Sequence, residues 1–211
     1  MNKRGIFIAY AVLLLMFGVI TVLTFTGVLA GFDLAVYDFM MRAESSGMTW
    51  FMENATHLGS IAFIVVLVVV LLAIPRTRKS LGYTTAIAAV IGASSNELLK
   101  LIFRRPRPEI EYMVSVTGHS FPSGHTQGST AVFIMLALMV FATVKSRKIK
   151  IPLIALCAII PFIVGITRIY LGVHFATDVM AGWVVGIAIA LAVYSVYMVK
   201  PSPRSSSQLG K

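Results

Sequence analysis

Charged residues are scarce in this chain, and acidic residues are the scarcest of them. Charged side chains make up 12% of the 211 residues, which is roughly half the share found in soluble globular domains. With only 8 aspartates and glutamates, the sequence contains no carboxylate cluster of the kind that holds magnesium. Its single cysteine, Cys157, excludes an internal disulfide framework and a multi-thiolate metal site. We therefore predict a protein without a metal or another cofactor.

Most of the chain consists of long apolar runs. Hydrophobic residues make up 58% of the chain, and they gather in six segments at residues 5–30, 58–75, 80–103, 124–144, 151–166 and 176–199. Runs of about twenty apolar residues can cross the hydrocarbon core of a bilayer, whereas a soluble protein would alternate polar and apolar positions. The pattern predicts an all-α, polytopic membrane protein with six transmembrane helices in one domain, residues 1–200. The Ser- and Pro-rich end, residues 201–211, is predicted to be a disordered cytoplasmic tail.

The net charge of +10 is distributed in a way that indicates membrane topology. Basic residues cluster at positions 3–4, 76–79, 145–150 and 200–211, between or outside the apolar runs. Short clusters of this kind do not form the extended basic face of a nucleic-acid-binding protein. With six helices all four clusters fall on one side, and the positive-inside rule places that side and both termini in the cytoplasm. We expect a bacterial plasma membrane as the location, the lipid bilayer as the partner, and no obligate protein partner.

Three polar stretches fall at the predicted outer ends of the third, fourth and sixth apolar segments. They are KLIFRRPRP at residues 100–108, PSGH at 122–125 and TRIYLGVHFATD at 167–178. Cations at these outer positions work against the positive-inside rule, which indicates that they serve a purpose there.

The first stretch presents two cations to the outer surface. Lys100 falls in the last turn of a helix, and Arg107 stands between two prolines that hold the backbone extended. The planar fork of an arginine suits phosphate oxygens, and a lysine adds a compact point charge. The alternative is that these cations contact anionic headgroups, or that Lys100 pairs with Glu97. Arg104 and Arg105 are interpreted as headgroup contacts.

The second stretch is typical of a helix start. Ser123 is a good N-cap, and Gly124 lets the backbone approach a ligand closely. Free N–H groups at a helix start attract anions, so His125 would lie beside a bound phosphate, where a proton donor is needed. An ordinary helix cap has the same sequence features.

The third stretch carries a His–Asp pair. His174 and Asp178 are four residues apart at the start of a helix and so share a face. A carboxylate there can fix the imidazole tautomer and leave the other ring nitrogen free to attack. Arg168 is expected within reach of the same pocket. The alternative is a His–Asp pair with a structural role only, which fixes the conformation of a loop.

In order and spacing, the three stretches resemble the signature of the type 2 phosphatidic acid phosphatase superfamily. That signature is Lys, six residues, Arg-Pro; then Pro-Ser-Gly-His; then Ser-Arg, five residues, His, three residues, Asp. The matching positions are Lys100, Arg107, Pro108, Pro122, Ser123, Gly124, His125, Arg168, His174 and Asp178. The one departure is Thr167, which keeps the hydroxyl of the usual serine.

The resemblance implies a role for each matched side chain. It implies that His174 is a nucleophile that forms a phosphohistidine, that Asp178 orients it, and that His125 is the general acid. The phosphate-binding positions that it implies are Lys100, Arg107, Ser123, Gly124 and Arg168. No metal ligand is implied.

We therefore expect a lipid phosphatase that hydrolyses phosphatidylglycerophosphate or phosphatidic acid on the outer membrane face. An undecaprenyl pyrophosphate phosphatase is the alternative within the same chemistry. A transporter with Lys100, Glu97 and Asp178 as pathway charges, and a lipid-binding protein without catalysis, are the alternatives outside it. The outer loop at residues 31–56 is expected to lie partly along the membrane surface, with Trp50 and Tyr37 as anchors.

Overall fold

The computed structural model describes residues 3–110 and 112–199, and all regular structure within them is helical. The elements are α1 Lys3–Phe25, α2 Ala30–Met41, α3 Ser46–Ala55, the 3-10 turn η1 Thr56–Gly59, α4 Ile61–Ala73, α5 Pro75–Thr77, the π-helical turn η2 Arg78–Gly82, α6 Tyr83–Phe103, α7 Gly124–Thr143, α8 Arg147–Tyr170 and α9 Ala176–Val199. The predicted tail at residues 201–211 lies outside the described residues.

Within residues 3–110 and 112–199, five helices are long and apolar enough to cross a membrane on their own. They are Gly5–Phe25, Pro75–Phe103, Gly124–Thr143, Arg147–Tyr170 and Ala176–Met198. A sixth span exists only if α3 with η1 and α4 count as one helix, which bends by 49° at Ser60. The all-helical, polytopic prediction is therefore confirmed, and the predicted second span is a bent pair in place of one straight helix.

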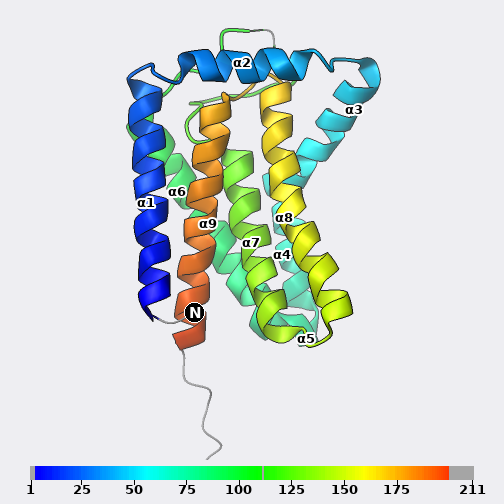
Figure 1. Ribbon diagram of the computed structural model, residues 1–211. Coiled ribbons are helices and arrows are strands. Elements are labelled where there is room, and N and C mark those ends of the chain that lie inside the picture. Colours follow the sequence, from blue (N-terminus) through cyan, green and yellow to red (C-terminus); the bar gives the residue numbers. More distant parts are fainter. Residues whose placement is uncertain (1–2, 111, 200–211) are drawn as a thin grey trace, which may run out of the picture.

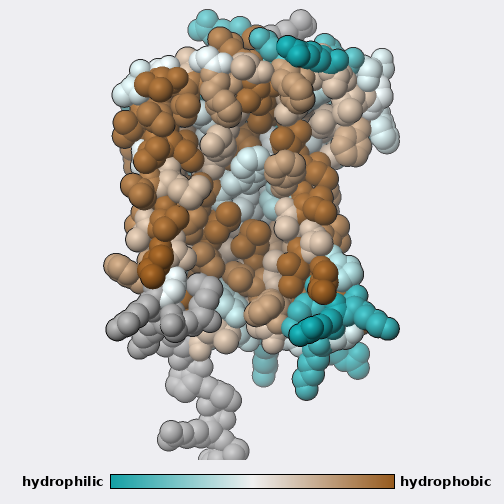
Figure 2. All heavy atoms as spheres, viewed as in Figure 1, coloured by the Kyte–Doolittle hydropathy of each residue, from teal (hydrophilic) through white to brown (hydrophobic). Residues whose placement is uncertain are grey.

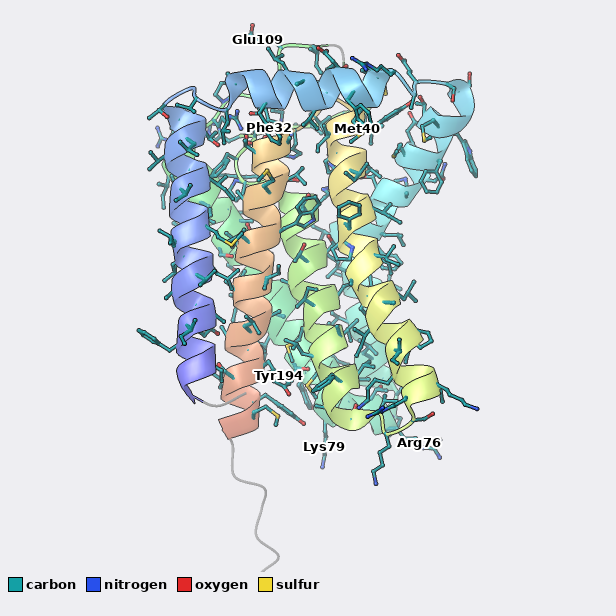
Figure 3. The ribbon with its side chains drawn as sticks, viewed as in Figure 1. Phe32, Met40, Arg76, Lys79, Glu109 and Tyr194 are labelled. Atoms are coloured by element: carbon teal, nitrogen blue, oxygen red, sulfur yellow. The ribbon has the colours of Figure 1, made fainter. Side chains whose placement is uncertain are left out.

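The surface has the polarity of a membrane protein. Figure 2 shows a broad hydrophobic belt between two hydrophilic ends. Arg76 and Lys79 lie at one end and Glu109 at the other (Figure 3). The first turn of α1 and the last turn of α9 share the end of Arg76 and Lys79 (Figure 1). The end that faces the cytoplasm stays a prediction from the positive-inside rule.

Helix α7 is the centre of the bundle. Most side chains of α7 along its apolar stretch are buried, whereas most of those of α1 are exposed, so α7 packs against other helices and α1 lies at the surface of the bundle. Its neighbours include α8 and α9, and the core between α7 and α9 contains Ala131, Met135 and Ala190. Glycines on α9 allow this close packing, as small residues do between membrane helices.

We predict that replacing Gly186 by alanine destabilises the bundle. A Cβ at Gly186 would lie 2.5 Å from Thr130 Cβ and 2.8 Å from the Gln127 backbone oxygen. Neither atom can move away cheaply, so overpacking is expected to cost about 1–3 kcal/mol and to lower the thermal unfolding midpoint in detergent. The matched control is Gly18→Ala on α1, where no atom lies within 4 Å of the added Cβ. Equal midpoints for the two variants would contradict the packing described here.

The segment between α1 and η1 forms two helices. Helix α2 lies across the ends of α8 and α9, and α3 slopes down from it toward α4 (Figure 1). Met40 of α2 packs against a buried cluster that contains Tyr170, Leu171 and Val173 (Figure 3). Trp50 is 67% exposed on α3, as a membrane anchor requires. This segment therefore covers the end of the bundle opposite Arg76 and Lys79 (Figures 1 and 3).

Candidate active site

The three polar stretches meet beneath α2, at the ends of α6, α7, α8 and α9 that lie on the Glu109 side of the bundle (Figures 1 and 3). Arg107 Nη1 lies 3.3 Å from His174 Nε2, which joins the first stretch to the third. The Ser123 N–H donates to the Asp178 backbone oxygen at 3.1 Å, which joins the second to the third. A Cβ on Gly124 would lie 3.5 Å from Lys100 Nζ, which joins the second to the first. Segments far apart in the chain thus bring Lys100, Arg107 and His174 together in one cationic site, which we call the pocket.

His174 is buried, and its two ring nitrogens have different surroundings. Nδ1 lies 3.4 Å from Asp178 Oδ2 and 3.3 Å from Ser120 Oγ. The Ser120 hydroxyl itself donates to Asp178 Oδ2, so its oxygen is free to accept the Nδ1–H. This arrangement favours the tautomer with the proton on Nδ1 and leaves the Nε2 lone pair facing Arg107.

Burial lowers the pKa of His174 to about 4, and the hydrogen bond and charge of Asp178 only partly oppose this shift. The nearby cations Arg168 and Arg107 act in the same direction as burial and contribute to this lowered pKa. Since the folded pKa lies below the ordinary value, the ring is neutral above pH 4 or so. A neutral imidazole is the form that can act as a nucleophile at neutral pH.

Arg107 is held rigidly in the loop after α6. Its guanidinium donates to the backbone oxygens of Gly118 at 3.0 Å, Thr117 at 2.8 Å and Val173 at 2.8 Å. Burial lowers the pKa of Arg107, although an arginine stays cationic at neutral pH. The prolines on either side hold the backbone, and these carbonyls hold the side chain.

Lys100 lies in the last turn of α6 and pairs only loosely with Glu97, at 4.0 Å. The pairing expected from their spacing is confirmed, but the Glu97 side chain is 76% exposed and does not neutralise the lysine strongly. Lys100 also lies within electrostatic range of Arg107, Arg168 and Asp178. The lysine therefore belongs to the pocket.

Gly124 begins α7 at a point with no room for a side chain. An added Cβ would lie 2.9 Å from Asn96 Oδ1. Ser123 is the N-cap residue, but its hydroxyl makes no capping hydrogen bond to the backbone. It accepts a hydrogen bond from the Thr126 hydroxyl at 3.0 Å instead. The predicted cap position is confirmed, and the predicted capping bond is wrong.

Arg168 is a buried cation with spare hydrogen-bonding capacity. Its Nη1 donates to Thr56 Oγ1 at 2.9 Å, and its buried Nε has no partner among the described residues. It interacts electrostatically with His125. A buried N–H donor without a hydrogen-bond partner is costly unless a ligand accepts from it. The Arg168 guanidinium is therefore suited to bind an anion.

His125 lies in the first turn of α7, and its Cβ faces Gly59 of η1. It lies within electrostatic range of His174, Lys100 and Arg168. The two histidines therefore flank the same group of cations, one on α7 and one before α9.

The interpretation of Arg105 as a headgroup contact is wrong. Its Nη1 donates to Asp178 Oδ1 at 2.6 Å and to Thr177 Oγ1 at 2.7 Å, and its Nη2 donates to Asp33 Oδ2 at 2.8 Å. The guanidinium also stacks 4.0 Å above the Phe175 ring. The residue turns inward because two buried carboxylates attract it.

Three contributing residues escaped the sequence reasoning, namely Ser120, Asp33 and Thr56. Ser120 contacts both members of the His–Asp pair, Asp33 binds Arg105, and Thr56 binds Arg168. Each is a common residue type and none belongs to a motif, although Ser120 lies two residues before the PSGH stretch. The one available signal was Asp33, an acidic residue placed just after a hydrophobic run.

No group of three or more His, Cys, Asp or Glu side chains among residues 3–110 and 112–199 is arranged to hold a metal ion. The charge that faces the pocket is cationic, from Lys100, Arg107 and Arg168. Such a pocket attracts an anion.

The fold and this pocket define a class of polytopic membrane phosphatases. The sequence profile of the PAP2 superfamily matches residues 78–201, and the chain belongs to that family. It is a phosphoric monoester hydrolase embedded in the membrane, and lipid phosphates are the substrates that the family implies. The resemblance found in the motifs is confirmed.

Two curated relatives differ in the lipid that their names give. Phosphatidylglycerophosphatase B of Bacillus subtilis is 31% identical over 145 residues, which are 67% of this chain and 71% of that protein. Undecaprenyl-diphosphatase BcrC of the same organism is 32% identical over 124 residues, 56% of this chain and 58% of that protein. Their identities do not distinguish the two substrates.

Solved structures share the fold. The crystal structure of a PAP2-type phosphatidylglycerolphosphate phosphatase from Bacillus subtilis has a TM-score of 0.81 at 26% identity, and the match covers 92% of this chain and 98% of that one. Aquifex aeolicus LpxE has a TM-score of 0.63 at 24% identity, over 77% of this chain and 94% of that one, and supports the fold alone.

Proposed function

We propose that this enzyme hydrolyses the phosphate monoester of phosphatidylglycerophosphate, or of phosphatidic acid, through a phosphohistidine on His174. The observation that carries the proposal is the position of the His174 ring. One nitrogen is bound by Asp178 and Ser120, and the other faces the cation Arg107. A nucleophile of this kind needs one oriented nitrogen and one free nitrogen beside the phosphate.

In the first step, His174 Nε2 attacks phosphorus and the bond to the ester oxygen breaks. His125 gives its proton to the departing alcohol, as a general acid at this position does. The bound phosphate dianion favours the protonated form of His125. The Asp178 carboxylate holds the Nδ1 proton, so the ring keeps its orientation while it gains positive charge.

In the second step, water attacks the phosphohistidine and gives its proton to the now neutral His125. The bond between phosphorus and Nε2 breaks, which releases inorganic phosphate and neutral His174. Both histidines return to their starting protonation states. A covalent intermediate thus divides one difficult displacement into two easier ones.

Cations supply most of the stabilisation in this scheme. A phosphate monoester is dianionic and repels a nucleophile until its oxygens are neutralised. Lys100, Arg107 and Arg168 are the cations of the pocket, and Arg168 Nε has no hydrogen-bond partner among residues 3–110 and 112–199. The backbone at Ser123 and Gly124 lies at the start of α7, where N–H groups favour an anion. With these groups present, the chemistry needs no divalent ion.

The pocket is proposed to open on the outer membrane face. The clusters at positions 76–79 and 145–150 lie at the opposite end of the bundle from the pocket (Figure 1), and the positive-inside rule supports a cytoplasmic location for that end. A site next to the headgroup layer can take a lipid phosphate without removing the acyl chains from the bilayer.

A second candidate is the hydrolysis of undecaprenyl pyrophosphate, which the relationship to BcrC favours. The same nucleophile and cations would serve a pyrophosphate, whose leaving group is itself a phosphate. Such a leaving group depends less on a general acid.

The proposed function is tested by a phosphate-release assay on purified protein in detergent, with a panel of lipid phosphates, with and without EDTA. We expect phosphatidylglycerophosphate and phosphatidic acid to be hydrolysed with the highest kcat/KM, and EDTA to leave the rates unchanged. A strong preference for undecaprenyl pyrophosphate would favour the second candidate, and loss of activity in EDTA would contradict the metal-free mechanism. Absence of hydrolysis of every lipid would favour transport or lipid binding.

A further inference from the structure

Arg105 joins two carboxylates that come from distant parts of the chain. Asp178 lies on α9, and Asp33 lies on α2, the helix that covers the end of the bundle where the pocket lies (Figure 1). The distances are 2.6 Å to Asp178 and 2.8 Å to Asp33, and both carboxylate side chains are at most 2% exposed. The bridge is therefore screened from solvent, where charge-assisted hydrogen bonds are strongest.

Both oxygens of Asp33 accept hydrogen bonds from Thr177, at the start of α9, and one of them also accepts a hydrogen bond from Arg105. Asp33 Oδ1 accepts the Thr177 N–H at 2.9 Å, and Oδ2 accepts the Thr177 hydroxyl at 2.8 Å as well as Arg105. The N–H of Thr177 lies in the first turn of α9, where backbone donors lack helical partners. Asp33 thus caps from α2 the helix that carries Asp178.

The two oxygens of Asp178 are engaged by different partners. Oδ2 faces His174 Nδ1, the Ser120 hydroxyl and the Phe175 N–H, whereas Oδ1 accepts Arg105. A carboxylate held at only one oxygen can rotate about its terminal torsion, which has a broad energy profile. Arg105 removes that freedom because it fixes the oxygen that His174 does not use.

A planar fork is needed for this task. One guanidinium nitrogen of Arg105 reaches Asp178 and Thr177 while another reaches Asp33. A lysine carries the same charge on a single nitrogen and cannot hold this geometry. Asp33 supplies the second charge, so that Arg105 is shared between two carboxylates and does not neutralise Asp178 alone.

We propose that Arg105 is a positioning residue, which holds the Asp178 carboxylate toward His174 and is itself held by Asp33 of α2. The inference rests on the proposed roles of His174 and Asp178. It extends the site to α2, a helix that the phosphatase motifs do not include. It predicts that His174 is correctly oriented only when α2 is packed in its observed position.

The test compares Arg105→Lys, Arg105→Gln, Asp33→Asn and the double variant Asp33→Asn/Arg105→Gln in the full chain in detergent. Asp33→Asn and Arg105→Lys are expected to lower kcat about 10-fold, and Arg105→Gln about 100-fold, because small misplacements of reacting groups have effects of this size. KM is expected to stay within about twofold, because none of these side chains is placed to contact the phosphate. The double variant is expected to be no slower than Arg105→Gln, because Asp33 acts through Arg105.

Two exposed neighbours provide matched controls. Arg104→Gln removes the adjacent arginine, and Asp38→Asn removes the other aspartate of α2, and both side chains are exposed. Both controls are expected to keep wild-type kcat and KM. Thermal midpoints measured in the same preparations report on folding. If Arg105→Gln does not fold, Arg105→Lys and Asp33→Asn still decide the question through their kcat values.

Several outcomes would overturn the inference. These are wild-type kcat in Arg105→Lys and Asp33→Asn, a change in KM without a change in kcat, or additive losses in the double variant. An Asp178→Asn variant in the same series separates the two proposals. If Asp178→Asn is inactive while Asp33→Asn and Arg105→Lys are unaffected, only the role of Arg105 is wrong. If Asp178→Asn keeps full activity, the proposed catalytic pair is wrong as well.

Discussion

Replacing His174 by alanine is expected to lower kcat for phosphate release by at least about 10³-fold, because no other group can then take the phosphoryl. The ring is the one whose nitrogens face both Asp178 and Arg107. Substrate binding is expected to persist, since the cations that bind the phosphate remain. The measurement is inorganic phosphate released from phosphatidic acid in detergent micelles, together with lipid binding by the inactive protein.

His119→Gln is the matched control for this variant. His119 lies in the loop before α7 and matches no catalytic position. The control is expected to keep the wild-type rate. If His174→Ala kept phosphatase activity, the nucleophile would have been misassigned, and a transport or binding function would regain support.

Replacing Arg168 by methionine is expected to lower the activity of the enzyme without lowering its thermal stability. The guanidinium is buried and donates one hydrogen bond, to Thr56 Oγ1. Its Nε has no hydrogen-bond partner among the described residues. Loss of a phosphate-stabilising arginine is expected to lower kcat/KM by about 10³-fold. The thermal midpoint is expected to stay or to rise, because an apolar side chain of similar size removes the cost of burying an uncompensated charge.

Arg168→Lys and Arg104→Met complete this experiment. The lysine keeps the charge but loses the fork, so its loss of kcat/KM is expected to be smaller than that of Arg168→Met. Arg104 is exposed, and its replacement is expected to change neither quantity. A lower midpoint for Arg168→Met, together with near-normal kcat/KM, would show that Arg168 is a structural residue and not a phosphate ligand.

Much of this architecture was predictable because membranes restrict structure so strongly. A span must be helical and about twenty residues long, so the long apolar runs predict most of the helices. The predicted segment at 151–166 was nevertheless too short, since α8 covers Arg147–Tyr170. Its last turn contains Thr167 and Arg168, which are buried in the protein and so escape a criterion based on hydrophobicity.

The motifs also predicted that three distant stretches meet, and they do so at one end of the bundle, beneath α2. The inward turn of Arg105 was not predictable, because its two carboxylate partners are 72 and 73 residues away in sequence. Position alone assigned Arg104 and Arg105 to the same headgroup layer. Only the folded chain shows that Arg105 has buried partners and that Arg104 is exposed.

The bend at Ser60 was also not predictable from the hydrophobicity of the sequence. Sequence hydrophobicity joins residues 58–75 into one span, but Ser60 ends η1 in an extended conformation and caps α4 by accepting the Phe63 N–H at 3.2 Å. The bend brings η1 against α7 and α8, so that Thr56 reaches Arg168. The Ser60 cap at the start of α4 thereby allows Thr56 to contact Arg168 in the site.

The central claim is that His174 Nε2 faces a bound phosphoryl group whose oxygens are held by Lys100, Arg107 and Arg168. A crystal structure with orthovanadate, which adopts the five-coordinate geometry of phosphoryl transfer, tests this claim most directly. We predict that vanadium is bonded to His174 Nε2, with its equatorial oxygens contacting those three cations. Vanadate bound elsewhere, or bound here with another residue at the apical position, would contradict it.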